Sequence, residues 1–112
     1  MKFNEAVEQY LVEGPKDKLV KDIAKIYLKG KSPDSDFYKV IDDKISAVYD
    51  YLAENGHPTS GKFFDGLIMS IATGVKKSKS DAMKAVVGFA KKNKIENEND
   101  WADDVLEAWY AV

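Results

Sequence analysis

The segment Gly-His-Pro-Thr-Ser-Gly-Lys at residues 56–62 has the residue types and spacing that could hold a phosphate group. A glycine followed five residues later by Gly-Lys matches the loop whose backbone N–H groups and lysine cradle nucleotide phosphates. That loop needs a serine or threonine directly after the lysine to hold Mg²⁺, whereas Phe63 follows Lys62 here. It also needs a preceding strand, but residues 48–55 have the pattern of a helix end. No nucleotide is therefore predicted as a ligand.

The same segment is explained as a turn between two helices. Asn55 and Gly56 tolerate the left-handed backbone that ends many helices, and Pro58 prevents the helix from continuing. A side-chain oxygen of Thr59 or Ser60 can then cap the next helix.

Metal binding and catalysis are not favoured by the titratable residues. The chain has one histidine, His57, and no cysteine, which excludes His-rich and thiolate metal sites. Acids between Glu96 and Glu107 match ligand positions of a helix–loop–helix calcium site, but Trp101 occupies its glycine position. The neighbouring carboxylates Asp103 and Asp104 would point in different directions on a helix. The sequence therefore predicts no catalytic residue, no metal and no cofactor.

The residues most typical of a protein-binding surface lie near the C-terminus. Apolar residues from Trp101 to Tyr110 form two adjacent rows of a helix, and acids fill the remaining arc. Such a helix either inserts into the chain's own core, the favoured interpretation, or keeps one row for another protein. Tryptophan and tyrosine are common interface hot spots. The candidate partner-binding residues are Trp101, Asp103, Asp104, Glu107, Trp109 and Tyr110.

Charge is unevenly distributed over the last third of the chain. Residues 76–94 contain seven lysines and one acid, whereas residues 96–107 contain six acids and no base. The favoured interpretation is that the two segments neutralise each other on the surface. Alternatively, the lysines contact phosphate through counterion release, or the acids dock on a basic partner. The candidate nucleic-acid-binding residues are Lys76, Lys77, Lys79, Lys84 and Lys91.

A pattern of helix-core residues within residues 67–90 covers about a fifth of the chain. It comprises Leu67, Ile68, Ile71, Ala72, Asp81, Ala82, Lys84, Ala85, Val86 and Phe89. This pattern resembles the N-terminal helical hairpin of the histone-like bacterial DNA-binding proteins. The resemblance implies a helix–turn–helix hairpin, which in that family mainly dimerises. The β-ribbon arm that grips DNA in that family has no counterpart in this sequence.

Helices are the elements that must position all of these residues. Apolar spacing and capping residues predict six helical segments. They cover about residues 3–13, 16–29, 34–55, 59–73, 79–93 and 98–110. Strand signals are nearly absent, and the short connections suit a bundle or an orthogonal array of helices. The predicted fold class is all-α, a single compact domain of five or six helices over residues 1–112.

Bulk composition narrows the class of function. The chain has 112 residues, a net charge of −2 and 45% hydrophobic residues, as expected for one folded domain. No apolar run approaches the roughly 20 residues that span a bilayer, and the first residues lack the apolar core of a secretory signal. A cytoplasmic protein without membrane association is expected. All seventeen basic residues are lysine, which disfavours sequence-specific DNA reading by arginine.

These observations predict a small non-enzymatic regulatory module that binds a partner protein through its acidic and aromatic C-terminal helix. The partner is unidentified, and a homodimer is compatible with the surplus of apolar helix faces. The alternative is a helix-turn-helix nucleic-acid-binding protein that uses residues 76–94. The small size and lysine-only composition suit an accessory protein of a phage or mobile element.

Overall fold

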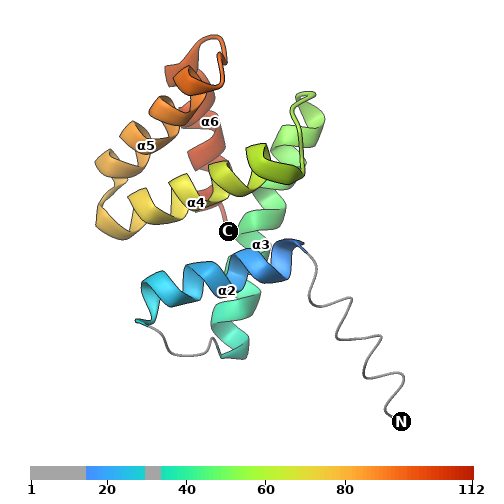
Figure 1. The fold of residues 1–112 in the computed structure, drawn as a ribbon, viewed down its shortest axis with the longest axis vertical. Helices are drawn as coiled ribbons and strands as arrows, with labels where there is room; N and C mark the ends of the chain where they lie inside the picture. Colours follow the sequence, from blue (N-terminus) through green and yellow to red (C-terminus); the bar gives the residue numbers. More distant parts are fainter. Residues whose placement is uncertain (1–14, 30–33) are drawn as a thin grey trace.

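Five α-helices make up the part of the chain that the structure describes. The computed structural model describes the backbone of residues 15–29 and 34–112 and the side chains of residues 18–29 and 34–112. The helices are α2 (Pro15–Tyr27), α3 (Ser35–Glu54), α4 (Gly61–Lys77), α5 (Lys79–Lys92) and α6 (Glu98–Tyr110) (Figure 1). These ranges contain no strand, and the predicted all-α fold class is confirmed. The helix predicted over residues 3–13 lies outside the described residues.

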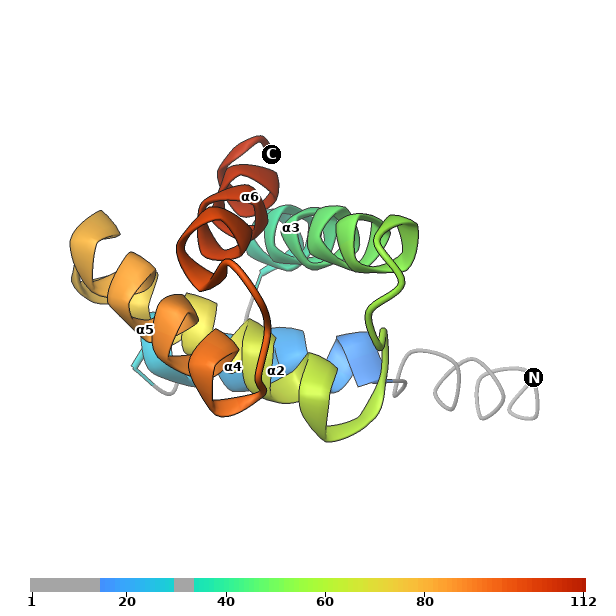
Figure 2. The same cartoon turned by 90° about the horizontal axis from the view of Figure 1, so that it is seen from above.

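The helices form two layers. Helices α3 and α6 pack side by side in one layer, and α2, α4 and α5 lie in the other (Figure 2). The C-terminal helix α6 also packs against α5, so it contacts both layers. Consequently, the solvent-exposed side of α6 is bordered by α3 on one side and by α5 on the other.

The core consists of apolar side chains that recur at helical spacing on every helix. In α3 the stripe Ile41, Ile45, Val48 and Leu52 is buried, as its spacing predicts. Burial of each such side chain contributes about 1.5–3 kcal/mol. The largest fully buried side chains are Val20, Ile23, Ile45, Val48, Leu52, Phe64, Leu67, Ile68, Ile71, Val86, Val105 and Trp109.

The hairpin of α4 and α5 differs from the sequence prediction at Gly74. The prediction ends a helix at residue 73, but α4 continues to Lys77 and leaves Ser78 as the only connecting residue. A Cβ atom at Gly74 would lie 2.6 Å from the Cα of Ala82. The glycine therefore allows the two helices to approach closely and does not end α4.

Capping and long-range polar contacts fix the helix ends in this region. The Ser78 hydroxyl accepts a hydrogen bond from the Asp81 N–H at 3.0 Å and donates to its carboxylate at 2.9 Å. This reciprocal bonding caps the start of α5. The Tyr27 hydroxyl donates to the carbonyl of Ala72 at 2.8 Å, which ties the end of α2 to α4.

The phosphate-loop-like segment at residues 56–62 is an interhelix turn that leads into α4. Gly56 and Gly61 have φ angles of 75° and 74°, the left-handed backbone that glycine adopts without strain. Ser60 occupies the N-cap position of α4, as predicted, but makes no side-chain capping hydrogen bond. Because a helix precedes the turn, the segment lacks the strand that a phosphate-binding loop requires.

Candidate functional site

Both tryptophans of α6 belong to the chain's own core. Trp101 is 6% exposed and Trp109 is 2% exposed. Their eight-residue separation, with Val105 midway, places them on one face of α6, which packs against α3 and α5. This burial agrees with the favoured interpretation that the helix inserts into the chain's own core, and it leaves neither indole exposed as a partner-binding anchor. The third aromatic of the predicted partner-binding residues, Tyr110, is 38% exposed.

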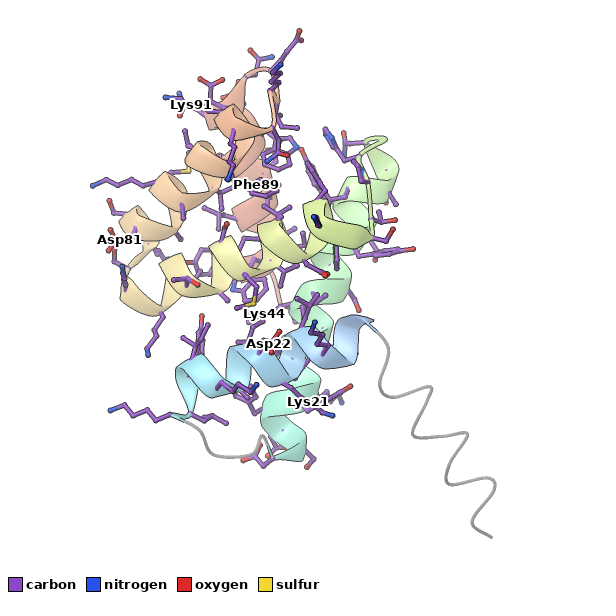
Figure 3. All side chains as sticks on the ribbon, in the orientation of Figure 1. Lys21, Asp22, Lys44, Asp81, Phe89 and Lys91 are labelled. Carbon is purple, nitrogen blue, oxygen red and sulfur yellow. The ribbon has the colours of Figure 1, made fainter. Side chains whose placement is uncertain are left out.

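An aromatic cluster surrounds Trp101. Its indole Nε1–H donates a hydrogen bond to Nε2 of His57 at 3.1 Å. The ring of Phe89 stacks on Trp101 at a centroid distance of 6.4 Å, and Phe63 meets Phe89 edge to face at 5.2 Å. Figure 3 shows Phe89 projecting from α5 toward α4. The single histidine of the chain thus has a packing role, because it satisfies a buried indole N–H.

The end of α6 is held by Lys44 of α3. The Lys44 Nζ donates hydrogen bonds to the carbonyl oxygens of Trp109 at 3.0 Å and of Val112 at 2.7 Å. It also lies 5.7 Å from the centroid of the Trp109 ring. A cation at the C-terminal end of a helix stabilises it, while burial lowers the pKa of the Lys44 ammonium.

The outer arc of α6 presents carboxylates to solvent. Asp103, Asp104 and Glu107 are all exposed, as their predicted place opposite the apolar rows requires. Burial and then the nearby carboxylate of Asp104 raise the pKa of the Tyr51 hydroxyl, which lies on α3. Since Tyr51 faces α6, the neighbouring row of exposed residues on α3 lies beside the exposed carboxylates of α6.

That row of α3 is also acidic. Asp43, Asp50 and Glu54 are spaced by seven and four residues and are exposed. Together, α3 and α6 carry ten acidic residues and two lysines. We call seven of the exposed acids of this layer the acidic face: Asp43, Asp50, Glu54, Asp100, Asp103, Asp104 and Glu107.

The five lysines predicted to contact nucleic acid divide into two groups. Lys76 donates to the carbonyl of Ile26 at 2.7 Å, and Lys79 lies 5.1 Å from the centroid of the Tyr110 ring. The ammonium groups of these two lysines thus contact other parts of the molecule. By contrast, Lys77, Lys84 and Lys91 are exposed, and their ammonium groups make no hydrogen bond or ion pair within the described residues.

The lysines of residues 76–94 and the acids of residues 96–107 are not directly paired. Across the part of the chain that the structure describes, no ion pair of 4.0 Å or less joins these two segments. The mutual neutralisation favoured from the sequence therefore does not occur through contacts. Both sets of charges remain available to solvent, although salt screens their effect beyond about 8 Å.

Two shallow grooves flank α5. The groove between α5 and α6 has a volume of about 440 Å³ and is lined by Lys79, Met83, Asp103, Leu106, Glu107 and Tyr110. The groove between α4 and α5 has a volume of about 410 Å³ and is lined by Met69, Ser70, Thr73, Gly74, Lys77, Asp81 and Ala85. The sequence pattern did not single out Met83 and Leu106, because their spacing is that of ordinary core residues.

The described ranges contain neither a metal-binding cluster nor a membrane-spanning helix. No group of three or more His, Cys, Asp or Glu side chains in residues 18–29 and 34–112 could hold a metal ion. The acids that match calcium-loop spacing lie largely in α6, which is helical from Glu98 onward. Within the same described ranges, no helix has the length and apolar character needed to cross a bilayer.

The hairpin implied by the resemblance of residues 67–90 is present as α4, Ser78 and α5. It is one part of the arrangement of five helices that the structure describes, in which α5 is covered on one side by α6 (Figure 1). No protein-family model, curated protein or solved structure gives a significant match to this chain.

Proposed function

We propose that this chain is a non-enzymatic protein-binding module that docks a basic surface of its partner on the acidic face. One observation carries the proposal. Trp101 and Trp109 fix α6 from within, while the outward carboxylates of the same helix have no ion-pair partner in the described part of the chain. Because the helix is already ordered, little conformational entropy is lost when a partner binds.

Charge favours a basic partner. The ten acids and two lysines of α3 and α6 produce a one-sided negative field on a protein whose net charge is only −2. Such a field accelerates encounter with a positively charged surface and disfavours acidic ones. The exposed ring of Tyr110, beside the acids, adds an amphipathic contact of the kind enriched at interfaces.

Affinity capture with matched charge variants tests the proposal. The acidic-face variant carries D103N, D104N and E107Q, and the control carries K77Q, K84Q and K91Q, so each variant removes three charges. The bait is incubated with an extract of cells that make the protein, and bound proteins are quantified by mass spectrometry. We expect wild type and control to retain the same basic partner, and the acidic-face variant to bind it about tenfold more weakly. Equal retention by all three baits would refute the acidic face as the docking surface.

A second candidate function is binding to nucleic-acid phosphate through Lys77, Lys84 and Lys91. The observation that favours it is that these three ammonium groups are exposed and unpaired within the described residues. Each neutralised phosphate would contribute about 0.9 to the slope of log affinity against log salt. Fluorescence anisotropy with a DNA duplex at several salt concentrations measures that slope. A slope near zero, or an unchanged slope in the triple lysine variant, would exclude this function.

A further inference from the structure

We propose that the groove between α5 and α6 receives an apolar side chain from an amphipathic basic helix of the partner. The inference rests on the proposed function, because the groove borders the acidic face. The proposed function names only a basic surface of the partner. Here the partner segment is a helix with leucine-sized residues on one side and lysine or arginine beside them.

The floor of the groove is apolar and adaptable. Leu106 is 6% exposed at its base, and Met83 of α5 is half-buried beside it. The ring of Tyr110 forms one end. A volume of about 440 Å³ accommodates an aliphatic side chain together with part of the helix that carries it. Methionine adapts its shape to different side chains, which suits a docking site.

The rim of the groove favours one orientation of the partner. Asp103 and Glu107 lie four residues apart, one turn of α6, and both are exposed at the groove. They can pair with one or two cations spaced by a turn on the partner helix. At the end that Tyr110 forms, the ammonium of Lys79 lies 5.1 Å from the Tyr110 ring centroid and repels a partner cation. The cations of the partner are therefore directed toward α6.

Two other occupants fit the groove less well. Residues 1–14 carry three glutamates and one lysine, so the acidic rim would repel this segment of the chain. A second copy could offer the exposed surface of its own α5, which carries Ser80, Lys84, Gly88 and Lys91. That surface has lysines but no large apolar side chain to fill the groove. An external basic and apolar helix satisfies both requirements.

A pair of synthetic peptides tests the groove. The first is an acetylated, amidated 14-residue helix of lysine, alanine and leucine, with its leucines spaced three and four residues apart. The second is identical except that glutamine replaces every leucine, so its charge is unchanged. Binding is followed through the methyl resonance of Met83 in ¹³C-methyl-labelled protein. We expect the leucine peptide to shift that resonance and to bind at least about tenfold more tightly than the glutamine peptide.

Two double variants separate the groove from the acidic face as a whole. D103N/E107Q removes the rim charges, and D43N/D50N removes the same number of charges from α3, away from the groove. We expect only D103N/E107Q to weaken the leucine peptide strongly. Equal binding of both peptides, with equal weakening by both variants, would overturn the groove and leave the acidic face standing. Binding that neither variant changes would overturn the acidic face as well, and an absence of binding by either peptide would overturn both.

Discussion

The layer of α3 and α6 and the hairpin of α4 and α5 are both strongly charged, with opposite signs. The first carries ten acids and two lysines, and the second carries seven lysines and two acids. On α6 every acid from Asp100 onward faces solvent. In the hairpin, by contrast, Lys76 and Lys79 are engaged with Ile26 and Tyr110. The basic hairpin therefore uses part of its charge in contacts within the molecule, whereas the carboxylates of α6 have no ion-pair partner among the described residues.

The largest expected effect concerns the buried face of α6. Trp109→Ala removes an aromatic side chain that is 2% exposed, and we expect a loss of about 3–5 kcal/mol of unfolding free energy. Tyr110→Ala, next in sequence but 38% exposed, is the control and should cost about 1 kcal/mol or less. Urea denaturation followed by circular dichroism measures both. Similar losses in the two variants would contradict the division of α6 into buried and outer faces.

The contact between α4 and α5 provides the next largest effect. Gly74→Ala places a Cβ atom 2.6 Å from the Cα of Ala82, and we expect a destabilisation of about 1–3 kcal/mol. Gly88→Ala is the control, because a Cβ there has no heavy atom within 4 Å. That change should stabilise the protein by about 0.5–1 kcal/mol through helix propensity. Thermal unfolding compares the two, and a stabilising Gly74→Ala would show that the helices do not approach closely at this point.

A moderate effect is expected at the aromatic cluster that supports the start of α6. His57→Ala removes the acceptor of the Trp101 indole N–H, which lies 3.1 Å away. An unsatisfied buried donor costs about 1–3 kcal/mol. His57→Gln keeps an acceptor at a similar reach and should recover part of the loss. If both substitutions leave the urea midpoint unchanged, the hydrogen bond does not contribute to stability.

The smallest expected effect is a change in the alkaline titration of Tyr51, which lies on α3 beside Asp104 of α6. Burial and the neighbouring Asp104 raise the pKa of Tyr51 above its ordinary value of 10.0. The folded state therefore binds the Tyr51 hydroxyl proton more tightly than the unfolded state does. The resulting contribution to the free energy of unfolding is fully present below pH 10, and it is lost as the pH rises through the higher pKa of the folded state. Asp104→Asn should lower the pKa of Tyr51, measured as earlier tyrosinate absorbance near 295 nm in difference titrations. No difference from wild type would argue against the contact between Tyr51 and Asp104.

The sequence was sufficient for most of the helical framework. The helix predicted over residues 98–110 coincides with α6, and the one predicted over 34–55 differs from α3 by one residue at each end. Capping residues and apolar spacing are local signals, so they determine such boundaries well. The helix predicted over residues 59–73 ends four residues before α4 does. Gly74 allows the close approach of Ala82, which is a tertiary contact that no local pattern reveals.

The candidate site was only partly predictable for the same reason. The carboxylates of α6 were identified from their position opposite the apolar rows. Whether Trp101 and Trp109 face the core or a partner depends on which helices cover them, and this is a tertiary property. The partner of His57 is 44 residues away in sequence, so its packing role had no local signal. Met83 and Leu106 line a groove only because α5 and α6 leave space between them.

Tryptophan fluorescence with a neutral and an anionic quencher tests most directly the claim that α6 is anchored by two tryptophans buried in the core. The chain has two tryptophans, both on α6, so its emission reports on this helix alone. Acrylamide is the essential quencher, because the acidic face would repel iodide even from an exposed indole. We predict blue-shifted emission and weak quenching by acrylamide that rises to the unfolded level in urea. Red-shifted emission with strong acrylamide quenching of the folded protein would contradict the buried face of α6 and, with it, the acidic face that it supports.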